Sequence, residues 1–264
     1  MLCMEESVKV FAKQMVKKID KKIRRELKAD FLKMGRTIDI GADGTPTKYI
    51  DKIAEDVAIK LIKKAPVSVN LLSEEAGLID NNADYIFVLD PIDGTRNASR
   101  GIPFFSVSLA VGRHSLSDVE YGIVKQVSTA DIYEAEAGRG AFFNKNRVVV
   151  PDVASRDSLF SVTLGKRCEE NMHNMIKDVH VRSLGAASLE MCLVATGALD
   201  AYIVVRDYMR VTDIAASTLF LREAGGIVTD LNGDSLDMTL TLDERTSVIA
   251  AGNYTLIEEL IDQF

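Results

Sequence analysis

Apolar residues recur at every fourth position in the first segment of the chain, and this spacing predicts a long amphipathic helix. The apolar positions on its slowly drifting face are Phe11, Met15, Ile19, Ile23 and Leu27. Lysines and arginines fill most positions between them, as in a surface patch that binds nucleic acid or a membrane or in a solvated helix face. The solvated face is favoured because the whole chain is acidic and no aromatic residues are interleaved with the basic ones. A second helix with similar spacing is predicted over residues 49–64, after a glycine-punctuated loop over residues 41–47. The chain therefore begins with two helices.

From residue 67 onward, short apolar runs predict strands. The predicted strands are residues 67–72, 85–89, 106–111, 121–124, 161–164, 201–205, 226–229 and 247–251. Further helices are predicted over about 186–196, 213–225 and 254–264. Residues 144–152 carry no helix signal, and we take them as a seam between two halves, 1–148 and 149–264, of a single domain with the functional site between them. The pattern indicates a mixed α/β fold.

Composition narrows the class of protein. The 264 residues are 47% hydrophobic and 27% charged with a net charge of −7, which is typical of a globular protein and unlike a disordered chain. No window approaches the roughly 18 consecutive apolar residues that a membrane span needs. The acidic N-terminus lacks the apolar stretch of a signal peptide, and the three cysteines form no CxxC pair. We expect a cytoplasmic protein without a disulfide framework or a zinc site.

The string Asp90-Pro91-Ile92-Asp93-Gly94-Thr95 carries the most specific chemistry. An apolar strand delivers Asp90 at its carboxyl end, where ligand sites of α/β proteins cluster. Asp90 and Asp93 can converge on one or two hard cations, and the Ile92 carbonyl between them offers a further oxygen. Gly94 lets the backbone approach a ligand closely, and if a helix begins there, its first amides form an anion site. The string predicts metal ions beside a phosphate-sized cradle.

Phosphate monoester hydrolysis needs this combination of groups. Paired Mg²⁺ ions neutralise the phosphate, lower the pKa of a bound water and stabilise the leaving oxygen. Such a site requires several carboxylates but no serine, cysteine or histidine nucleophile. The three histidines, His114, His173 and His180, all lie outside the motif, which counts against a histidine-phosphatase or serine-hydrolase mechanism.

The Asp90–Thr95 string resembles the signature of the inositol monophosphatase superfamily, a group of lithium-sensitive, Mg²⁺-dependent phosphomonoesterases. Ser73-Glu74-Glu75 resembles the upstream acidic motif of this family, and the segment 211–216 resembles its second signature. Residues 182–187 and 197–202 match a connecting segment of the same family. These matches follow the family's order across nearly the whole chain. The resemblance implies a layered αβαβα sandwich in which helices alternate with two sheets.

Two departures from the family pattern fall beside the motifs. Thr212 stands where a tryptophan is usual, and Ala98 stands where an aromatic residue is usual. Both are packing or rim positions, so metal binding is not put in doubt. They suggest an archaeal-type member, a group that resembles enzymes acting on both inositol phosphates and fructose 1,6-bisphosphate.

The resemblance also implies a ligand set for two Mg²⁺ ions, with Mn²⁺ as an alternative. Glu74, Asp90 and the carbonyl of Ile92 would hold the first ion. Asp90, Asp93 and Asp213 would hold the second, with Asp90 bridging the two.

Catalytic roles follow from the same resemblance. Thr95 and Glu74 would orient the attacking water, and the amides of Gly94 and Thr95 would bind phosphate oxygens. Attack would be direct and in line. A mobile catalytic loop of the family precedes the second helix, where Asp43 is the candidate ligand of a third, weaker Mg²⁺ and Asp51 is the alternative. Glu75 is a candidate for an outer carboxylate.

Basic residues are candidates for contacts to the rest of the substrate. Arg206 and Arg210 precede Asp213, where inositol phosphatases of animal type place a glutamate, and an arginine suits a second phosphate. Lys166 and Arg167 follow a predicted strand and could do the same, as could Arg96 beside the phosphate cradle.

The leading hypothesis is a Mg²⁺-dependent phosphatase acting on inositol 1-phosphate, fructose 1,6-bisphosphate or both. The main rival within the superfamily is a 3′(2′),5′-bisphosphate nucleotidase, whose members usually carry extra segments. A non-catalytic metal-binding relative is a further alternative, and intact Glu74, Asp90 and Asp213 argue against it. We expect a small phosphorylated substrate and, by resemblance, a homodimer, with neither nucleic acid nor membrane as a partner.

Overall fold

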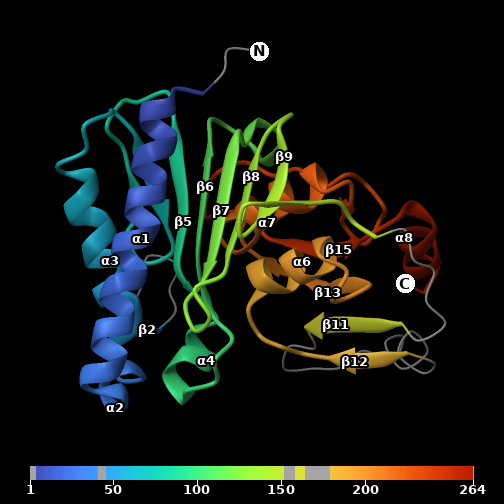
Figure 1. The fold of residues 1–264 in the computed structure, drawn as a ribbon, viewed down its shortest axis with the longest axis horizontal. Helices are drawn as coiled ribbons and strands as arrows, with labels where there is room; N and C mark the ends of the chain where they lie inside the picture. Colours follow the sequence, from blue (N-terminus) through green and yellow to red (C-terminus); the bar gives the residue numbers. More distant parts are fainter. Residues whose placement is uncertain (1–3, 41–45, 152–157, 164–178, 264) are drawn as a thin grey trace.

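The computed structural model describes residues 4–40, 46–151, 158–163 and 179–263. Two long helices form its first layer: α1 (Glu6–Ala29) and α3 (Tyr49–Ile62). The apolar stripe of α1 is buried as its spacing predicts, with Phe11 4% exposed and Met15, Ile19 and Ile23 fully buried. This stripe packs, together with α3, on one face of a large sheet (Figure 1).

The large sheet has eight strands among the described residues. In spatial order they are β10 (Asn146–Val148), β9 (Gly140–Phe143), β8 (Ile132–Glu136), β7 (Tyr121–Gln126), β6 (Ser106–Gly112), β5 (Ile86–Asp93), β3 (Asn70–Ser73) and β4 (Gly77–Ile79). Neighbouring strands are antiparallel except for the parallel pair β3 and β5. A separate two-stranded sheet joins β1 (Thr37–Ile40) to β2 (Pro46–Lys48).

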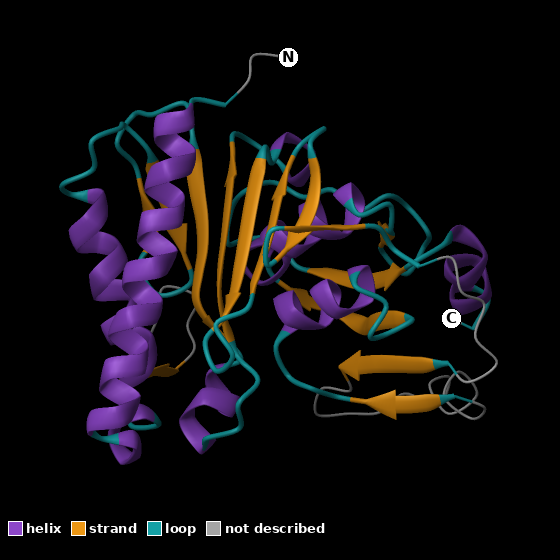
Figure 2. Cartoon of the chain, in the orientation of Figure 1, coloured by secondary structure: helices purple, strands orange, loops and turns teal. Residues whose placement is uncertain are grey.

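A second sheet of five strands is built from the later part of the chain. Its order is β12 (His180–Arg182), β11 (Leu159–Thr163), β13 (Ala201–Met209), β15 (Thr246–Ala251) and β14 (Ile227–Thr229). Its strands run in a different direction from those of the first sheet (Figure 2).

Helices α6 (Ala187–Ala195) and α7 (Val211–Glu223) lie between the two sheets, and α8 (Tyr254–Ile261) covers the outer face of the second sheet (Figure 1). Three shorter helices, α2 (Phe31–Met34), α4 (Thr95–Arg100) and the 3₁₀ turn Leu116–Asp118, complete the described elements. The order of layers confirms the predicted αβαβα sandwich. Helices α6 and α7 contribute to one hydrophobic core that also includes residues of both sheets.

Strand β5 separates two cores, and its alternation determines where its last residues point. Ile86 and Val88 lie in the core that contains α6 and α7, whereas Phe87 and Leu89 lie in the core that contains α1 and α3. Asp90 is still paired with β6, so the alternation continues to it. Asp90 therefore lies on the face that looks toward α7.

Several strands differ from their predicted bounds. The strand predicted from residue 67 begins only at Asn70, and the strand predicted to end at residue 205 continues to Met209. After an irregularity, Met209 pairs with Thr246, and this pairing extends the strand beyond its apolar run. The sequence did not predict the strands β1, β2, β4, β8, β9 and β12. Within the described residues, no helix combines the length and the apolar character that crossing a membrane requires.

Candidate active site

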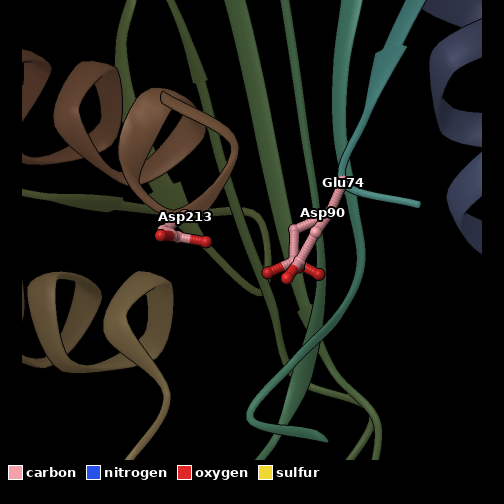
Figure 3. A group of neighbouring side chains, drawn as sticks. All are labelled: Glu74, Asp90 and Asp213. Carbon is pink, nitrogen blue, oxygen red and sulfur yellow. The ribbon is translucent and has the colours of Figure 1, made fainter. Parts of the chain in front are cut away.

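Three carboxylates from distant parts of the chain converge in the cleft between the sheets. In the parallel pair, Ser73 of β3 is opposite Leu89 of β5, so Glu74, which follows β3, comes next to Asp90 of β5. Asp213, in the first turn of α7, approaches them from the helical layer (Figure 3). Each of the three offers one oxygen, and these oxygens lie within 4.8 Å of one another.

The donor set fits a divalent cation, since carboxylate oxygens are the ligands that hard cations prefer. Asp90 is only 3% exposed, and one of its oxygens accepts a hydrogen bond from the Ile92 amide at 2.9 Å. Burial, followed by repulsion from Glu74, Asp93 and Asp213, raises the pKa of Asp90 well above its usual range. A bound cation would offset this repulsion, so the arrangement favours metal binding.

Asp93, at the end of β5, is held by the first residues of α6. Its oxygens accept hydrogen bonds from the backbone amides of Ala187 at 3.1 Å and Ser188 at 2.9 Å, and from the Ser188 hydroxyl. Burial raises the pKa of Asp93 to about 7, and the charge of Asp213 contributes. Asp93 is thus outside the group of three oxygens but electrostatically coupled to it.

Position 94 requires glycine. Its φ of +89° is left-handed, and an added Cβ would lie 3.1 Å from the Ala186 Cβ and 3.1 Å from the Phe104 carbonyl oxygen. The turn is followed at once by α4, which begins at Thr95. The amides of Gly94 and Thr95 are therefore placed at the start of a helical turn, as the sequence predicts.

Thr95 contacts the carboxylate of Asp51. Its hydroxyl lies 2.8 Å from Asp51 Oδ1 and 3.0 Å from the Ile92 carbonyl oxygen. Asp51, an early residue of α3, was the alternative candidate for a third metal ion. Burial raises its pKa to about 6. The structure pairs Asp51 with Thr95, and no local sequence signal joins these two positions, 44 residues apart.

One turn along α3, Glu55 was missed by the sequence reasoning. It is 1% exposed and accepts a hydrogen bond at 2.8 Å from Ser73, the residue before Glu74. Burial raises the pKa of Glu55 to about 7, and nearby Glu75 adds repulsion. Glu75 accepts a hydrogen bond from Thr47. The spacing of Asp51 and Glu55, one helical turn apart, was the available signal.

The basic candidates occupy different places. The guanidinium of Arg210 forms an ion pair with Glu74, and Arg206 is exposed on β13. Asp43, Lys166 and Arg167 lie outside the described residues.

Next to the carboxylates is a cavity of about 340 Å³. Its walls include Asp93, Thr95, Arg96 and Asp213 on the side of the acidic cluster. Thr163, Tyr202 and Met209 line it from the second sheet. The cavity is large enough for a small phosphorylated substrate.

The layered sandwich and its acidic cluster fit one class of enzyme, the metal-dependent phosphatases that hydrolyse phosphoric monoesters. A model of the inositol monophosphatase family matches residues 4–264, nearly the whole chain. The chain therefore belongs to the inositol monophosphatase family.

Curated relatives agree with this assignment. The chain is 40% identical over 243 residues to a fructose-1,6-bisphosphatase/inositol-1-monophosphatase of Methanothermobacter thermautotrophicus, covering 86% of each chain. It is 36% identical over 249 residues to a protein of the same name from Methanocaldococcus jannaschii, covering 93% of this chain and 96% of the relative. It is also 37% identical to a bifunctional NADP phosphatase/NAD kinase of that organism, covering 96% of this chain and 50% of the relative.

Solved structures show the same fold. A Pyrococcus horikoshii protein with similarities to inositol-1 monophosphatase superimposes with a TM-score of 0.84 at 35% identity, covering 98% of each chain. A crystal structure of an inositol monophosphatase-fructose 1,6 bisphosphatase gives a TM-score of 0.86 at 34% identity, covering 99% of this chain and 100% of the other.

Proposed function

We propose that this chain hydrolyses inositol 1-phosphate and fructose 1,6-bisphosphate to release inorganic phosphate, in a reaction that depends on Mg²⁺. The observation that carries the proposal is the convergence of Glu74, Asp90 and Asp213 within 4.8 Å beside the Gly94–Thr95 turn. The names of the archaeal relatives support the choice of substrates.

The proposed ligand set is the one that the family resemblance implies. Glu74, Asp90 and the Ile92 carbonyl would hold one Mg²⁺, and Asp90, Asp93 and Asp213 would hold another. When bound, the ions neutralise the phosphate and make water a better nucleophile at neutral pH. Mn²⁺ has similar ligand preferences, and Asp43 is the proposed ligand for a third ion.

The chain's own residues supply orientation and proton transfer. The Thr95 hydroxyl can donate its proton to Asp51 Oδ1 while its lone pairs accept a proton from the attacking water. Asp51 is suited to accept that proton because its pKa is raised to about 6, close to neutral pH. Glu74 would orient the same water, and the amides of Gly94 and Thr95 would bind phosphate oxygens.

Recognition of the rest of the substrate is assigned to the basic residues. Arg206, Arg210 and Lys166 are the proposed contacts to a second phosphate group. Arg210 also pairs with Glu74, so it links substrate binding to the acidic cluster. A cytoplasmic homodimer remains the expectation from the family.

The similarity to the bifunctional NADP phosphatase/NAD kinase raises a second candidate substrate, the 2′-phosphate of NADP. A 3′(2′),5′-bisphosphate nucleotide is a third, because its phosphate is also a monoester on a sugar ring. Both would occupy the same cavity and use the same carboxylates.

A phosphate-release assay tests the proposal. Fructose 1,6-bisphosphate, inositol 1-phosphate, NADP and adenosine 3′,5′-bisphosphate are compared at equal concentration with Mg²⁺, and with chelator as the control. Chelator-sensitive turnover of the first two is expected. Preference for either nucleotide would replace the proposed substrates, and failure to hydrolyse any of the four would contradict the proposal.

A further inference from the structure

The turn that precedes α6 and the first two residues of α6 direct five successive backbone amides at two carboxylates. The amide of Leu184 donates to Glu190 Oε1 at 3.0 Å, and those of Gly185 and Ala186 donate to Glu190 Oε2 at 3.2 and 3.1 Å. The next two amides, described above, donate to Asp93. Glu190 therefore accepts the first three of these amides, and Asp93 accepts the last two.

The carbonyl groups of the same turn contact the Gly94–Thr95 turn and helix α4, which follows it. Asn97, in α4, donates from Nδ2 to the Leu184 carbonyl at 2.7 Å and to the Phe104 carbonyl at 2.8 Å. An added Cβ on Gly94 would lie 3.2 Å from the Gly185 carbonyl oxygen. The turn thus lies against the segment that carries Gly94 and Thr95, and a shift of the turn would displace this segment.

Glu190 lines the cavity, but donors of the protein itself occupy the oxygens of its carboxylate. It is 1% exposed, and besides the three amides it accepts a hydrogen bond from the Ser161 hydroxyl on β11. Four donors occupy the roughly four acceptor sites of a carboxylate. The carboxylate of Glu190 therefore binds the protein's own groups, namely the amides of the turn and the Ser161 hydroxyl of β11.

The geometry points to Glu190 as a positioning residue for metal binding: by fixing the amides of residues 184–186, it fixes the adjoining amides that orient the Asp93 carboxylate. This inference rests on the proposed role of Asp93 as a metal ligand. Groups that orient metal ligands in this way typically change metal affinity about 10- to 100-fold when they are replaced.

Glu190→Gln is the sharpest substitution, because it keeps the size of the side chain and replaces one acceptor oxygen by an NH₂ donor. Either Leu184 and Ser161, or Gly185 and Ala186, would then face a donor instead of an acceptor. We expect the Kd for Mn²⁺, measured by calorimetry on the full chain, to rise about tenfold. Excess Mg²⁺ should restore kcat, since the catalytic groups themselves are unchanged.

Glu223→Gln provides a matched control. Glu223 also accepts two backbone amides, from Gly138 and Gly140 at 2.7 Å each, but it holds a turn between β8 and β9. Its replacement removes comparable hydrogen bonds, so it should lower thermal stability while leaving the Mn²⁺ Kd unchanged. A Glu190→Gln protein whose Mn²⁺ Kd matches that of wild type and of Glu223→Gln would overturn the inference.

Ser161→Ala covers the case in which Glu190→Gln does not fold. It removes one of the four donors to Glu190, and a rise of about threefold in the Mn²⁺ Kd is expected. An unchanged Kd in this folded variant would contradict the inference. Because metal affinity is measured without substrate, a wild-type protein that binds Mn²⁺ but hydrolyses no phosphate ester would refute the proposed function alone.

Discussion

Arg210 contacts two of the three converging carboxylates. Its guanidinium pairs with Glu74, 136 positions away in the chain, and its backbone amide donates to Asp213 Oδ2 at 2.9 Å. Both partners of the ion pair are largely buried, at 16% and 20% side-chain exposure. A fixed positive charge therefore lies at the edge of the acidic cluster, where it acts on any cation or phosphate bound there.

Arg210→Gln tests this arrangement. Removing a positive charge beside the cluster should strengthen cation binding by roughly 1 kcal/mol, or about fivefold in Kd for Mn²⁺. The same variant should raise KM for fructose 1,6-bisphosphate if the guanidinium also contacts phosphate. Calorimetry measures the first effect and steady-state kinetics the second. A weaker Mn²⁺ affinity would be incompatible with the electrostatic argument.

Asp213→Asn should remove most activity and leave the fold intact. A lost metal ligand is worth several kcal/mol in the transition state, so kcat/KM should fall at least about a hundredfold. In chelator, the variant should unfold at the same or higher temperature than wild type, because one of the mutually repelling charges is gone. Asp237→Asn is the control, since Asp237 accepts from the amide of Ser117 outside the cavity. Near-normal turnover of Asp213→Asn would defeat the metal assignment.

Asp93→Asn should change both the activity and the stability of the protein. Activity should fall as for Asp213→Asn, but the Asp93→Asn protein should be about 1 kcal/mol less stable than the Asp213→Asn protein, because Asp93 holds the first amides of α6. Denaturant unfolding in chelator measures the difference between the two variants. Equal stability of both would indicate that the hydrogen bonds to α6 contribute little.

Thr95→Ala and Thr95→Ser separate the hydroxyl from the space it fills. Loss of a group that transfers a proton typically costs 10²- to 10⁴-fold in rate, so the kcat of Thr95→Ala should fall by about a hundredfold or more. Thr95→Ser keeps the hydroxyl that reaches Asp51 and should retain most activity. Single-turnover phosphate release at saturating Mg²⁺ measures both. Equal losses would mean that the methyl group, rather than the hydroxyl, is what matters.

Glu55→Gln should change how stability depends on pH. The pKa of Glu55 is raised from 4.5 to about 7, so the folded protein binds more protons than the unfolded chain between these values. The contribution of Glu55 to stability is therefore present below about pH 4.5 and is lost as pH rises through 7. From pH 5 to pH 8, the variant should gain about 2 kcal/mol relative to wild type. Urea unfolding in chelator at several pH values measures this, and identical slopes would contradict it.

Arg206→Ala addresses the choice between substrates. Because a guanidinium pairs with phosphate more strongly than with a hydroxyl, the variant should lose more kcat/KM on fructose 1,6-bisphosphate than on inositol 1-phosphate. A difference of about tenfold corresponds to one charge-assisted hydrogen bond. Equal losses on both substrates would exclude Arg206 as the contact to the second phosphate.

The sequence predicted best what is contiguous in the chain. Asp90, Asp93 and Gly94 belong to one string, and the apolar run before them identifies the strand that delivers them. The buried stripe of α1 follows from its period in the same way. The convergence of Glu74 and Asp213 with Asp90 was expected from family resemblance, because hydrophobic periodicity gives no information on which strands pair.

The contacts that were missed join distant positions. Asp51 meets Thr95 across 44 positions, and Glu55 meets Ser73 across 18. Each depends on the placement of α3 over the end of β3 and β5, which only the packed structure determines. Glu190 lies in the helix that the sequence predicts over about residues 186–196. It is buried, but its carboxylate is satisfied by a turn that no helical pattern reveals.

The alternation of β5 makes the active site sensitive to length as well as to residue identity. Since Ile86 and Val88 face one core and Phe87 and Leu89 the other, deleting a single residue from this strand would exchange the two sets. Asp90 would then turn from α7 toward the helices on the opposite face. Exchanging one apolar residue for another of similar size keeps this alternation, whereas a single inserted or deleted residue would reverse it and abolish the site.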